Sequence, residues 1–443
     1  MTENELRDLH ALVGHRLAGI SKPAVAASSQ TLDTDLNSEQ VSRYSRQLLL
    51  PAFGKSAQVK LASASALVIG AGGLGSPVIM YLAGAGIGTL GVVDDDIVDT
   101  SNLHRQIVHG GCPNGTNKAV SAGRAVAQLN PNVNYVAYTE RFCPGNADEL
   151  VQKFDVVIDA SDNLLTRYLV NDTCVFHNRP LVSGAAIGTE GYVTVYNYAP
   201  MDGLCYRCIY PEPPPLSTVG SCSENGVLGM VPGVIGCIQA LEALKILSGI
   251  PTASVLARRL CIFDALAGDF SKIGLPPRSS QCRVCGEQPS ICTTRESYEW
   301  CQRHGLTEPA NCLLPSMSAE LPKENRISCQ QYNALAHSSV QPDGRHPWLL
   351  LDVRDRTQFS ICALPNAINV PLLELNDRLE EIQTLACGRE VVVVCRRGID
   401  SISAVRKLVD HVGAKRLLCG PVRNLDGGLQ EWHDSVDHMF PIY

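Results

Sequence analysis

The sequence predicts an α/β protein, with a doubly wound and mostly parallel sheet in a first domain and a smaller α/β domain after it. Short apolar segments of strand length alternate with helical patterns over residues 38–285, and the alternation resumes over 326–443. A chain of 443 residues is also too long for one compact core. Residues 286–325 lose the periodicity and are rich in Pro, Ser and Cys, so we expect a linker there with some ordered pieces.

The individual elements follow from the apolar patterns. Residues 1–37 are expected to form a short amphipathic helix and then a linker rich in Ser, Thr and Ala. For the first domain, the patterns predict strands at 66–69, 89–93 and 154–159, a helix at 76–85 and a largely buried helix at 231–247. For the second, they predict strands at 348–352 and 390–394 and a helix at 401–412.

Composition excludes several classes of protein. The hydrophobic fraction of 45% and the charged fraction of 18% are typical of a soluble globular chain. A net charge of −7 argues against direct nucleic-acid binding as the main role. We find no run of about 18 consecutive apolar residues, and hence expect no membrane span. The N-terminus lacks the pattern of a signal peptide, so we expect a cytosolic protein whose 18 cysteines are mostly reduced.

A glycine-rich segment, Gly70-Ala71-Gly72-Gly73-Leu74-Gly75, follows a predicted strand and begins a helix. Glycines let the backbone approach a phosphate closely, and the amides at a helix N-terminus favour its charge. Asp94 ends the next strand, the usual place for a carboxylate that accepts ribose hydroxyls. This pattern fits an NAD enzyme and an ATP enzyme equally well.

The next segment favours ATP. Arg105, in Ser101-Asn102-Leu103-His104-Arg105-Gln106, and Lys118, at the start of the following helix, are both cationic. An enzyme that cleaves ATP between its α and β phosphates needs cations where charge grows on the leaving pyrophosphate, whereas an NAD site does not. The alternative is that both are solvated surface charges.

These motifs, with Arg43-Tyr44-Ser45-Arg46-Gln47 and Asp159-Ala160-Ser161-Asp162-Asn163, resemble the ubiquitin-activating-enzyme-like adenylyltransferases over residues 38–285. The resemblance implies a Rossmann-like fold, ATP with magnesium as substrate, a ubiquitin-like carrier protein as partner, and a homodimer. It implies that Asp162 holds the magnesium ion with Asn163 beside it, and that Arg46 reaches into the partner subunit's site. It also implies ATP contacts from the loop and the segments after it: Gly73, Asp94, Asn102, Arg105 and Lys118, with Ser101, Leu103 and His104 in the same stretch.

Two C-x2-C pairs, Cys205 with Cys208 and Cys282 with Cys285, supply four thiolates. Four thiolates suit a tetrahedral zinc ion with no ligand position left for water, which is the pattern of a structural site. The family resemblance places one structural zinc per chain at these positions. The alternative is that one of the pairs is incidental.

Cys222 lies in a polar loop just before the predicted buried helix. A cysteine in such a loop is poorly placed for core packing and well placed to attack an activated acyl group. The resemblance makes it the candidate for a covalent link to the carrier's C-terminal carbonyl. Some bacterial relatives work without such a cysteine, so a dispensable thiol is the alternative.

Cys395 follows a Val-rich strand and begins the loop Cys395-Arg396-Arg397-Gly398-Ile399-Asp400-Ser401, which leads into a helix. Backbone amides, the helix N-terminus and two arginines are expected to lower the pKa of this thiol, which suits a persulfide carrier. With the patterns at 350–354 and 363–371, this loop resembles the rhodanese family over 326–443. Ser401 stands where the related C-x5-R phosphatases have Arg, which favours sulfur transfer. An inactive docking domain is the alternative.

The order of the two domains resembles eukaryotic enzymes that activate sulfur carriers for molybdenum cofactor synthesis and transfer-RNA thiolation. The resemblance implies adenylation of the carrier's C-terminal glycine, and then sulfur transfer from a Cys395 persulfide loaded by a cysteine-desulfurase-type donor. Two other functions remain open from the residues. One is an NAD-dependent oxidoreductase with a rhodanese module, and the other is a non-enzymatic, zinc-stabilised scaffold.

Overall fold

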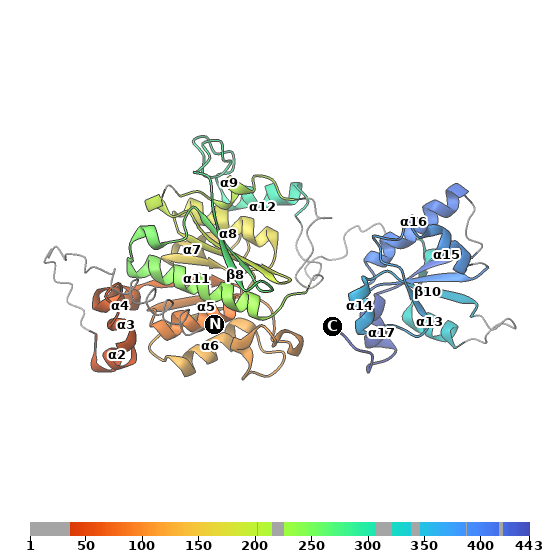
Figure 1. Ribbon diagram of the computed structural model, residues 1–443, viewed down its shortest axis with the longest axis horizontal. Coiled ribbons are helices and arrows are strands. Elements are labelled where there is room, and N and C mark those ends of the chain that lie inside the picture. Colours follow the sequence, from red (N-terminus) through yellow and green to blue (C-terminus); the bar gives the residue numbers. More distant parts are fainter. Residues whose placement is uncertain are drawn as a thin grey trace, which may run out of the picture. The chain divides into compact units, whose positions relative to one another are not determined.

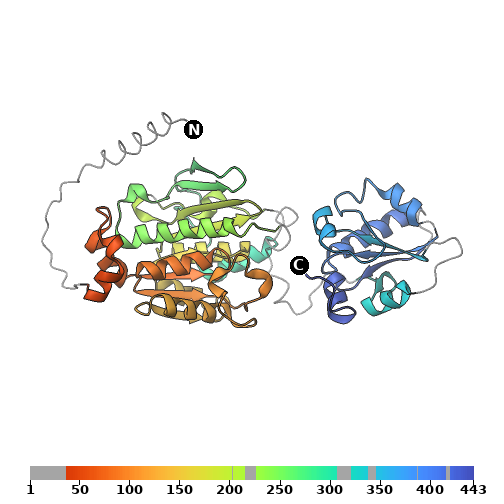
Figure 2. The ribbon, with the colours of Figure 1, turned by 60° about the horizontal axis from the view of Figure 1, so that its bottom comes forward.

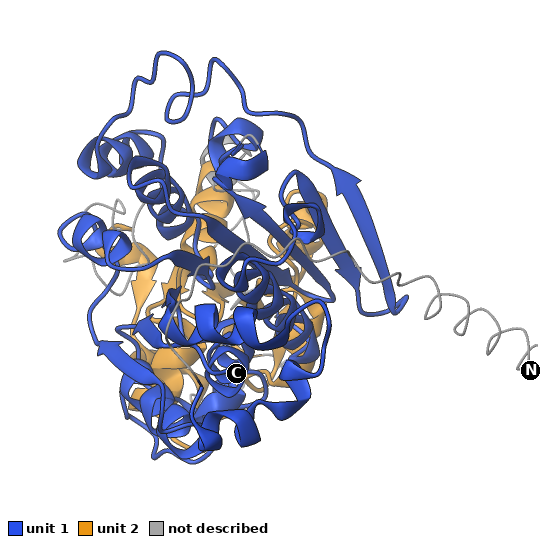
Figure 3. Cartoon of the chain, turned by 90° about the vertical axis from the view of Figure 1, so that its left-hand side faces the viewer, with its two compact units in different colours: residues 1–307 blue, residues 308–443 orange. Residues whose placement is uncertain are grey.

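The computed structural model describes residues 36–201, 203–214, 226–306, 321–337, 346–386, 388–415 and 420–443. The chain divides into two compact units, residues 1–307 and residues 308–443, which Figure 3 shows in different colours. The predicted N-terminal helix and the loop that contains Cys222 lie outside the described residues.

Unit 1 contains an eight-stranded sheet with the strand order β3-β2-β1-β4-β5-β6-β7-β8. Strands β1 to β5 run parallel in adjacent pairs, whereas β6, β7 and β8 are added in antiparallel fashion beside β5. The bounds are β1 (Ser65–Ile69), β2 (Thr89–Val93), β3 (Asn134–Tyr138), β4 (Val156–Asp159), β5 (Leu181–Ile187), β6 (Glu190–Tyr196), β7 (Arg259–Asp264) and β8 (Asp269–Gly274).

Helices cover both faces of this sheet, as predicted (Figures 1 and 2). One face packs against α4 (Gly54–Ser63), α5 (Gly75–Ala85), α6 (Lys118–Leu129) and α11 (Met230–Ser248). The other packs against α7 (Ala147–Gln152), α8 (Leu164–Phe176), α9 (Tyr206–Ile209) and α12 (Thr294–Arg303). Two short helices, α2 (Ser38–Arg43) and α3 (Ser45–Leu48), precede α4.

The central strands are buried because both faces are covered. In β1, Ala66 and Val68 enter one core cluster while Leu67 and Ile69 enter the other. A strand buried on both sides reads as a continuous apolar run rather than an alternating one. This explains why β1 and β2 could be predicted within one residue of their observed bounds.

The register of the parallel strands brings their carboxyl ends to one edge. Ile69 pairs with Val93 on β2 and with Asp159 on β4, and Val93 pairs with Tyr138 on β3. The loops that follow β1, β2 and β4 therefore leave the sheet side by side. In open α/β sheets, ligands bind in the crevice at this edge.

Helix α12 lies within the interval 286–325, which we expected to be a linker with some ordered pieces. It packs on α8, and its Trp300 and Cys301 are buried in the same core cluster as the four cysteines. A capping box begins it, in which Thr293 and Glu296 each accept a hydrogen bond from the other's backbone amide. Ordered structure of unit 1 thus extends past residue 285.

Helix α11 is long and apolar enough, by length and composition, to cross a membrane. We found no such segment in the sequence because Gln239, Glu242 and Lys245 interrupt the apolar run, although the average hydropathy stays high. In the structure, α11 packs along α5, β5 and β6 as a core helix of unit 1.

Unit 2 has a five-stranded, all-parallel sheet with the order β11-β10-β12-β13-β9. Helices α15 and α16 border one core cluster, and α13 and α17 border the other. The bounds are β9 (Arg326–Ile327), α13 (Cys329–Ala336), β10 (Trp348–Asp352), α14 (Arg356–Ile361), β11 (Ala367–Asn369), α15 (Leu379–Ala386), β12 (Glu390–Val394), α16 (Asp400–Lys415), β13 (Val422–Leu425) and α17 (Gly428–Ser435).

Candidate functional site

The glycine-rich loop between β1 and α5 is shaped by positions that exclude a side chain. Gly70 has φ +98°, and a Cβ there would lie 2.7 Å from the Ala160 carbonyl oxygen. A Cβ on Gly75 would lie 2.0 Å from the Gly70 carbonyl oxygen. Gly73 has more space around it, since a Cβ added there would lie 3.2 Å from the Pro232 side chain of α11. The first turn of α5 therefore approaches the loop backbone closely, as a phosphate-binding turn requires.

Asp94, at the end of β2, is tied to this loop. Its Oδ2 accepts a hydrogen bond from the Ala71 amide at 2.7 Å, and its Oδ1 accepts one from the Asp96 amide at 2.9 Å. Burial raises the pKa of Asp94 to about 6, although the charge of Lys118 opposes the rise. The carboxylate lies where the sequence analysis expected a ribose acceptor, and it titrates close to neutral pH.

Lys118 is the first residue of α6, and it is almost fully buried. Its Nζ lies 2.9 Å from Oδ2 of Asp96, whose side chain is 68% exposed. Asn117 caps α6 by accepting from the Val120 amide, and its Nδ2 donates to the Asp94 carbonyl at 3.0 Å. The helix cap thus fixes the lysine beside the carboxyl ends of the strands.

The segment from Ser101 to Arg105 is organised by its own side chains. Arg105 donates to Oδ1 of Asn102 at 2.6 Å and lies 3.2 Å from Nε2 of His104. Ser101 donates hydrogen bonds from its hydroxyl and its amide to the Asp99 carboxylate, which caps the short 3-10 turn at Thr100–Asn102. Leu103 follows this turn and is half-exposed. Packing against α11 also holds this segment, since a Cβ on Gly229 would lie 2.4 Å from the His104 carbonyl oxygen.

Asp162 and Asn163 follow β4 at the same edge and differ in role. Asp162 is exposed. Asn163 is the N-cap of α8, and its Oδ1 accepts from the Thr166 amide at 2.8 Å. Asp159 is fully buried, and it accepts hydrogen bonds from Ser161 and Ser183 and pairs with Arg167. The exposed carboxylate can therefore meet a cation, whereas Asn163 shapes the turn that presents it.

His109 is a residue of this site that the sequence analysis missed. It is fully buried, with Nε2 2.8 Å from the Ala71 carbonyl oxygen and Nδ1 2.9 Å from the Ser121 hydroxyl. Burial lowers the pKa of His109, so the neutral ring donates from Nε2 and accepts the Ser121 hydroxyl at Nδ1. The ring links the glycine-rich loop to α6, the helix of Lys118. A lone histidine outside any motif gave no signal of this role.

Arg46 does not join the loop within its own chain. It is exposed on α3, and its neighbour Gln47 donates to the Ala85 carbonyl oxygen at 3.1 Å. Ala85 ends α5, whereas the glycine-rich loop begins it. The role of Arg46 in a partner's site stays a prediction.

The four cysteines of the two C-x2-C pairs lie together. Their Sγ atoms are all within 4.8 Å of one another, and three of the separations run from 3.4 to 3.9 Å. Zinc–sulfur bonds of about 2.3 Å in a tetrahedron put the sulfurs about 3.8 Å apart, so the geometry fits a four-thiolate metal site. The separations are much too long for disulfides, which need about 2 Å.

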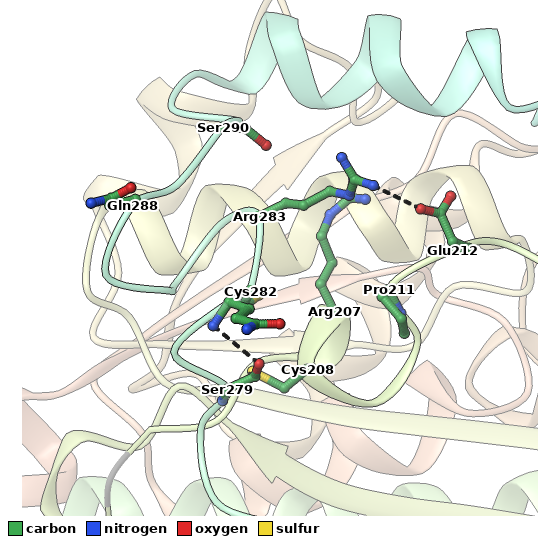
Figure 4. Close-up of a pocket in the computed structure, with 10 residues that line it drawn as sticks. Arg207, Cys208, Pro211, Glu212, Ser279, Cys282, Arg283, Gln288 and Ser290 are labelled. Carbon is green, nitrogen blue, oxygen red and sulfur yellow. Dashed lines mark hydrogen bonds and ion pairs between the residues drawn. The ribbon is translucent and has the colours of Figure 1, made fainter.

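A buried ion pair, Arg207 with Asp172, lies next to this cluster. Arg207, between Cys205 and Cys208, donates from Nε to the Asp172 carboxylate, and its guanidinium lies over the rings of Tyr168 and Trp300 at 4.6 and 4.3 Å. A pocket of about 500 Å³ lies beside the cluster, with Cys208 and Cys282 in its lining. Figure 4 shows residues that line this pocket. Arg207 lines this pocket, as do Arg283 and Glu212, which pair with each other at 3.0 Å. Trp300 comes from α12, so its contact with Arg207 packs this helix against the four-cysteine cluster.

In unit 2, Cys395 comes directly after β12 and is 1% exposed. Its Sγ lies 3.3 Å from Oγ of Ser401, in the first turn of α16. The loop backbone is held by α17, since the amide of Leu429 donates to the carbonyl oxygen of Cys395. The serine hydroxyl is thus placed to donate to a thiolate. Arg396 is half-buried, whereas Arg397 is exposed.

Two family models match the chain. The ThiF family model matches residues 44–284, and the rhodanese-like domain model matches residues 336–435. The first region contains the glycine-rich loop and three of the four clustered cysteines, and it ends one residue before Cys285. The second contains the Cys395 loop.

Curated relatives span nearly the whole chain. A Danio rerio protein named adenylyltransferase and sulfurtransferase MOCS3 is 42% identical over 441 residues, which cover 96% of this chain and 92% of the relative. The protein of that name from Aedes aegypti is 42% identical over 92% of this chain and 90% of its own length. Adenylyltransferase and sulfurtransferase MOCS3-1 of Zea mays is 42% identical over 93% of this chain and 85% of the relative. The chain therefore belongs to the ThiF family and carries a rhodanese-like domain after its ThiF region.

Proposed function

We propose that this chain adenylates the C-terminal glycine of a ubiquitin-like sulfur carrier and then transfers sulfur to it from a persulfide on Cys395. The relatives named adenylyltransferase and sulfurtransferase match over both units. The observation that carries the proposal is the presence, in one chain, of two features: a strand edge that places the Asp94 carboxylate and the Lys118 ammonium group beside the glycine-rich loop, and a buried cysteine that follows a parallel strand.

In the first step, a carboxylate oxygen of the carrier's terminal glycine attacks the α-phosphorus of ATP. A bond to phosphorus forms, the bond to pyrophosphate breaks, and an acyl-adenylate remains. Lys118 and Arg105 bind the charge that grows on the leaving pyrophosphate, and Asp94 accepts the ribose hydroxyls. Asp162 is the residue that would hold the magnesium ion, which offsets phosphate charge when it is bound.

In the second step, a cysteine-desulfurase-type donor passes a sulfane sulfur to Cys395. The terminal sulfur of the persulfide attacks the carrier's activated carbonyl, and AMP leaves. The product is an acyl disulfide that joins Cys395 to the carrier. A thiol reductant supplies two electrons to break its S–S bond, which leaves a thiocarboxylate on the carrier and a thiol on Cys395. Cys222 is the candidate either for holding the acyl group before this attack or for resolving the disulfide.

The four-cysteine cluster is proposed to hold one structural zinc per chain. Its thiolates join two segments whose cysteines are 77 residues apart in the sequence, and no ligand position remains for a substrate. The ion would therefore stabilise the lobe around α9 and α12 and would take no part in the chemistry.

We further propose a homodimer that forms through the face of α3, α5 and α11. A shallow pocket of about 280 Å³ lies there, lined by Tyr81 and Leu241, which are 62% and 49% exposed, and by Gln47, the neighbour of Arg46. A second copy would cover these apolar side chains and would bring Arg46 into the interface. Sedimentation should show Leu241→Glu as a monomer with reduced adenylation. The matched control is Leu266→Glu, 80% exposed between β7 and β8, which should remain a dimer.

The deciding experiment is carrier-dependent exchange of labelled pyrophosphate into ATP by the full chain. It should be run in turn with two carrier proteins that the resemblance suggests, both expected in the cytosol. One is the molybdopterin synthase small subunit, and the other is the carrier for transfer-RNA 2-thiolation. Exchange with either carrier supports adenylation and identifies which carrier is served. No exchange with any carrier, together with carrier-independent NAD reduction or with carrier binding alone, would favour an oxidoreductase or a scaffold.

A further inference from the structure

The end of the chain packs beside the Cys395 loop and is fixed at three points. The Tyr443 hydroxyl accepts a hydrogen bond from Nη1 of Arg354 at 2.5 Å. The carbonyl oxygen of Pro441 accepts from the Cys362 thiol at 3.6 Å, and that of Phe440 lies 2.7 Å from Nδ1 of His433. The last four residues are therefore part of the folded unit.

The anchor for Tyr443 is itself rigid. Arg354 is 2% exposed, and its guanidinium donates to both carboxylate oxygens of Asp352 and to the carbonyl oxygen of Cys362 at 2.7 Å. A guanidinium held by this many acceptors has little rotamer freedom left. The ring of Tyr443 is consequently held in a defined place.

The Tyr443 ring in turn contacts the guanidinium of Arg396, the residue directly after Cys395. The Arg396 guanidinium carbon lies 4.9 Å from the ring centroid of Tyr443, which is cation–π distance. The Arg396 backbone is also fixed, since its carbonyl oxygen accepts from the Gln430 amide at 3.0 Å. The adjacent Arg397 is exposed, so the two arginines of the loop are held differently.

We propose that Tyr443 is a positioning residue for sulfur loading, because its ring holds the Arg396 guanidinium at the Cys395 loop to receive an anionic sulfur donor. This inference rests on the proposed sulfur transfer at Cys395. Thiosulfate serves as the probe: its sulfane sulfur forms a bond to the Cys395 thiolate, the S–S bond of thiosulfate breaks, and sulfite leaves. Cyanide then takes the sulfur as thiocyanate and restores the thiolate.

A fixed cation matters at this step because two anions must meet. The dianion approaches a thiolate, and a guanidinium already in place lowers the electrostatic cost of that approach. Without the ring, Arg396 would have to be immobilised by each donor as it binds, at an entropic cost. The loss should therefore appear in the KM for thiosulfate and much less in kcat.

The test is thiosulfate-to-cyanide sulfur transfer by the full chain. Tyr443→Leu keeps apolar bulk but removes the π face, and it should raise KM by about three- to fivefold. Tyr443→Phe keeps the ring and should have a smaller effect. Met439→Ala, whose side chain is 89% exposed in the same tail, is the matched control and should behave as the unmodified chain.

A double-mutant cycle identifies the residue through which Tyr443 acts. In an Arg396→Ala background, Tyr443→Leu should change KM no further, whereas in an Arg397→Ala background the full effect should persist. An unchanged KM in Tyr443→Leu overturns the proposal. So does an equal rise in both backgrounds, or a fall in melting temperature and kcat with KM unmoved. Full transfer activity in Cys395→Ala would instead refute the proposed role of Cys395, and this outcome is distinct from the others.

Discussion

Replacement of Lys118 by Met should lower carrier-dependent ATP–pyrophosphate exchange by about 10²- to 10³-fold. The Lys118 side chain is 7% exposed, and its Nζ lies 2.9 Å from Asp96, so the ammonium group is already in place before substrate binds. Loss of one such donor at a site of developing charge typically raises the barrier by about 3–4 kcal/mol. Since each tenfold change in rate corresponds to about 1.4 kcal/mol, this rise in the barrier gives the expected loss of about 10²- to 10³-fold.

The stability of the same variant should change little. Met keeps the apolar stem of the side chain, and the Asp96 carboxylate left behind is 68% exposed and can be solvated. An ion pair with an exposed partner contributes at most about 1 kcal/mol to folding. Exchange is measured with carrier and ATP saturating, and melting temperature is measured by calorimetry.

Lys153→Met is the matched control, because Lys153 pairs with Glu149 at 2.6 Å on the surface of α7. Normal exchange by Lys118→Met would refute the assignment of this lysine to the pyrophosphate. An equal loss of exchange in both variants would show that the effect is not specific to the strand edge.

Three more outcomes are expected. Cys282→Ser should lose the bound metal and lower the melting temperature strongly, since a structural zinc contributes folding energy directly; metal analysis and calorimetry on the same sample decide this. Because the pKa of Asp94 is about 6, its carboxylate is protonated progressively as pH falls from 7 to 5, so ATP affinity should drop over that range. Titration with a fluorescent ATP analogue measures this, and a flat profile that matches Asp94→Asn would contradict it. Cys395→Ala should adenylate the carrier normally yet make no thiocarboxylate by mass spectrometry, while Cys222→Ala should be milder. Thiocarboxylate made by Cys395→Ala from a protein donor would leave unit 2 as a docking module.

Much of the fold could be predicted because its central elements are buried on all sides. The helix expected at 231–247 is observed as α11, Met230–Ser248, and β12 is observed at Glu390–Val394 as predicted. Helix α12 was not predicted because its residues are mostly polar, and its stability comes from Trp300 and Cys301 packing on α8. One signal was present, since Thr293 and Glu296 have the spacing of a capping box.

The site could be predicted only where its residues belong to contiguous motifs. His109 connects two segments through the Ala71 carbonyl and the Ser121 hydroxyl, and no local pattern encodes such a bridge. Asn163 has the residue type expected beside a metal ion, yet its side chain oxygen is used by the first turn of α8. Cys395 is buried because the β12–α16 loop packs against the rest of unit 2. Helix α17, from further along the chain, donates backbone hydrogen bonds to this loop.

The cysteine cluster also has a mechanical consequence. The two knuckles close a loop, because Cys205 and Cys282 are 77 residues apart in the sequence yet 3.6 Å apart at sulfur. If the chain were stretched from its ends, a metal held by the four thiolates would shield α11 and the β7–β8 hairpin from the applied force until both thiolates of one C-x2-C pair had left the metal. Loss of the second of these thiolates would release about 270 Å of hidden contour length in one step. A force trace recorded with chelator should lack this late step, because the same segment would then unravel with the rest of the unit.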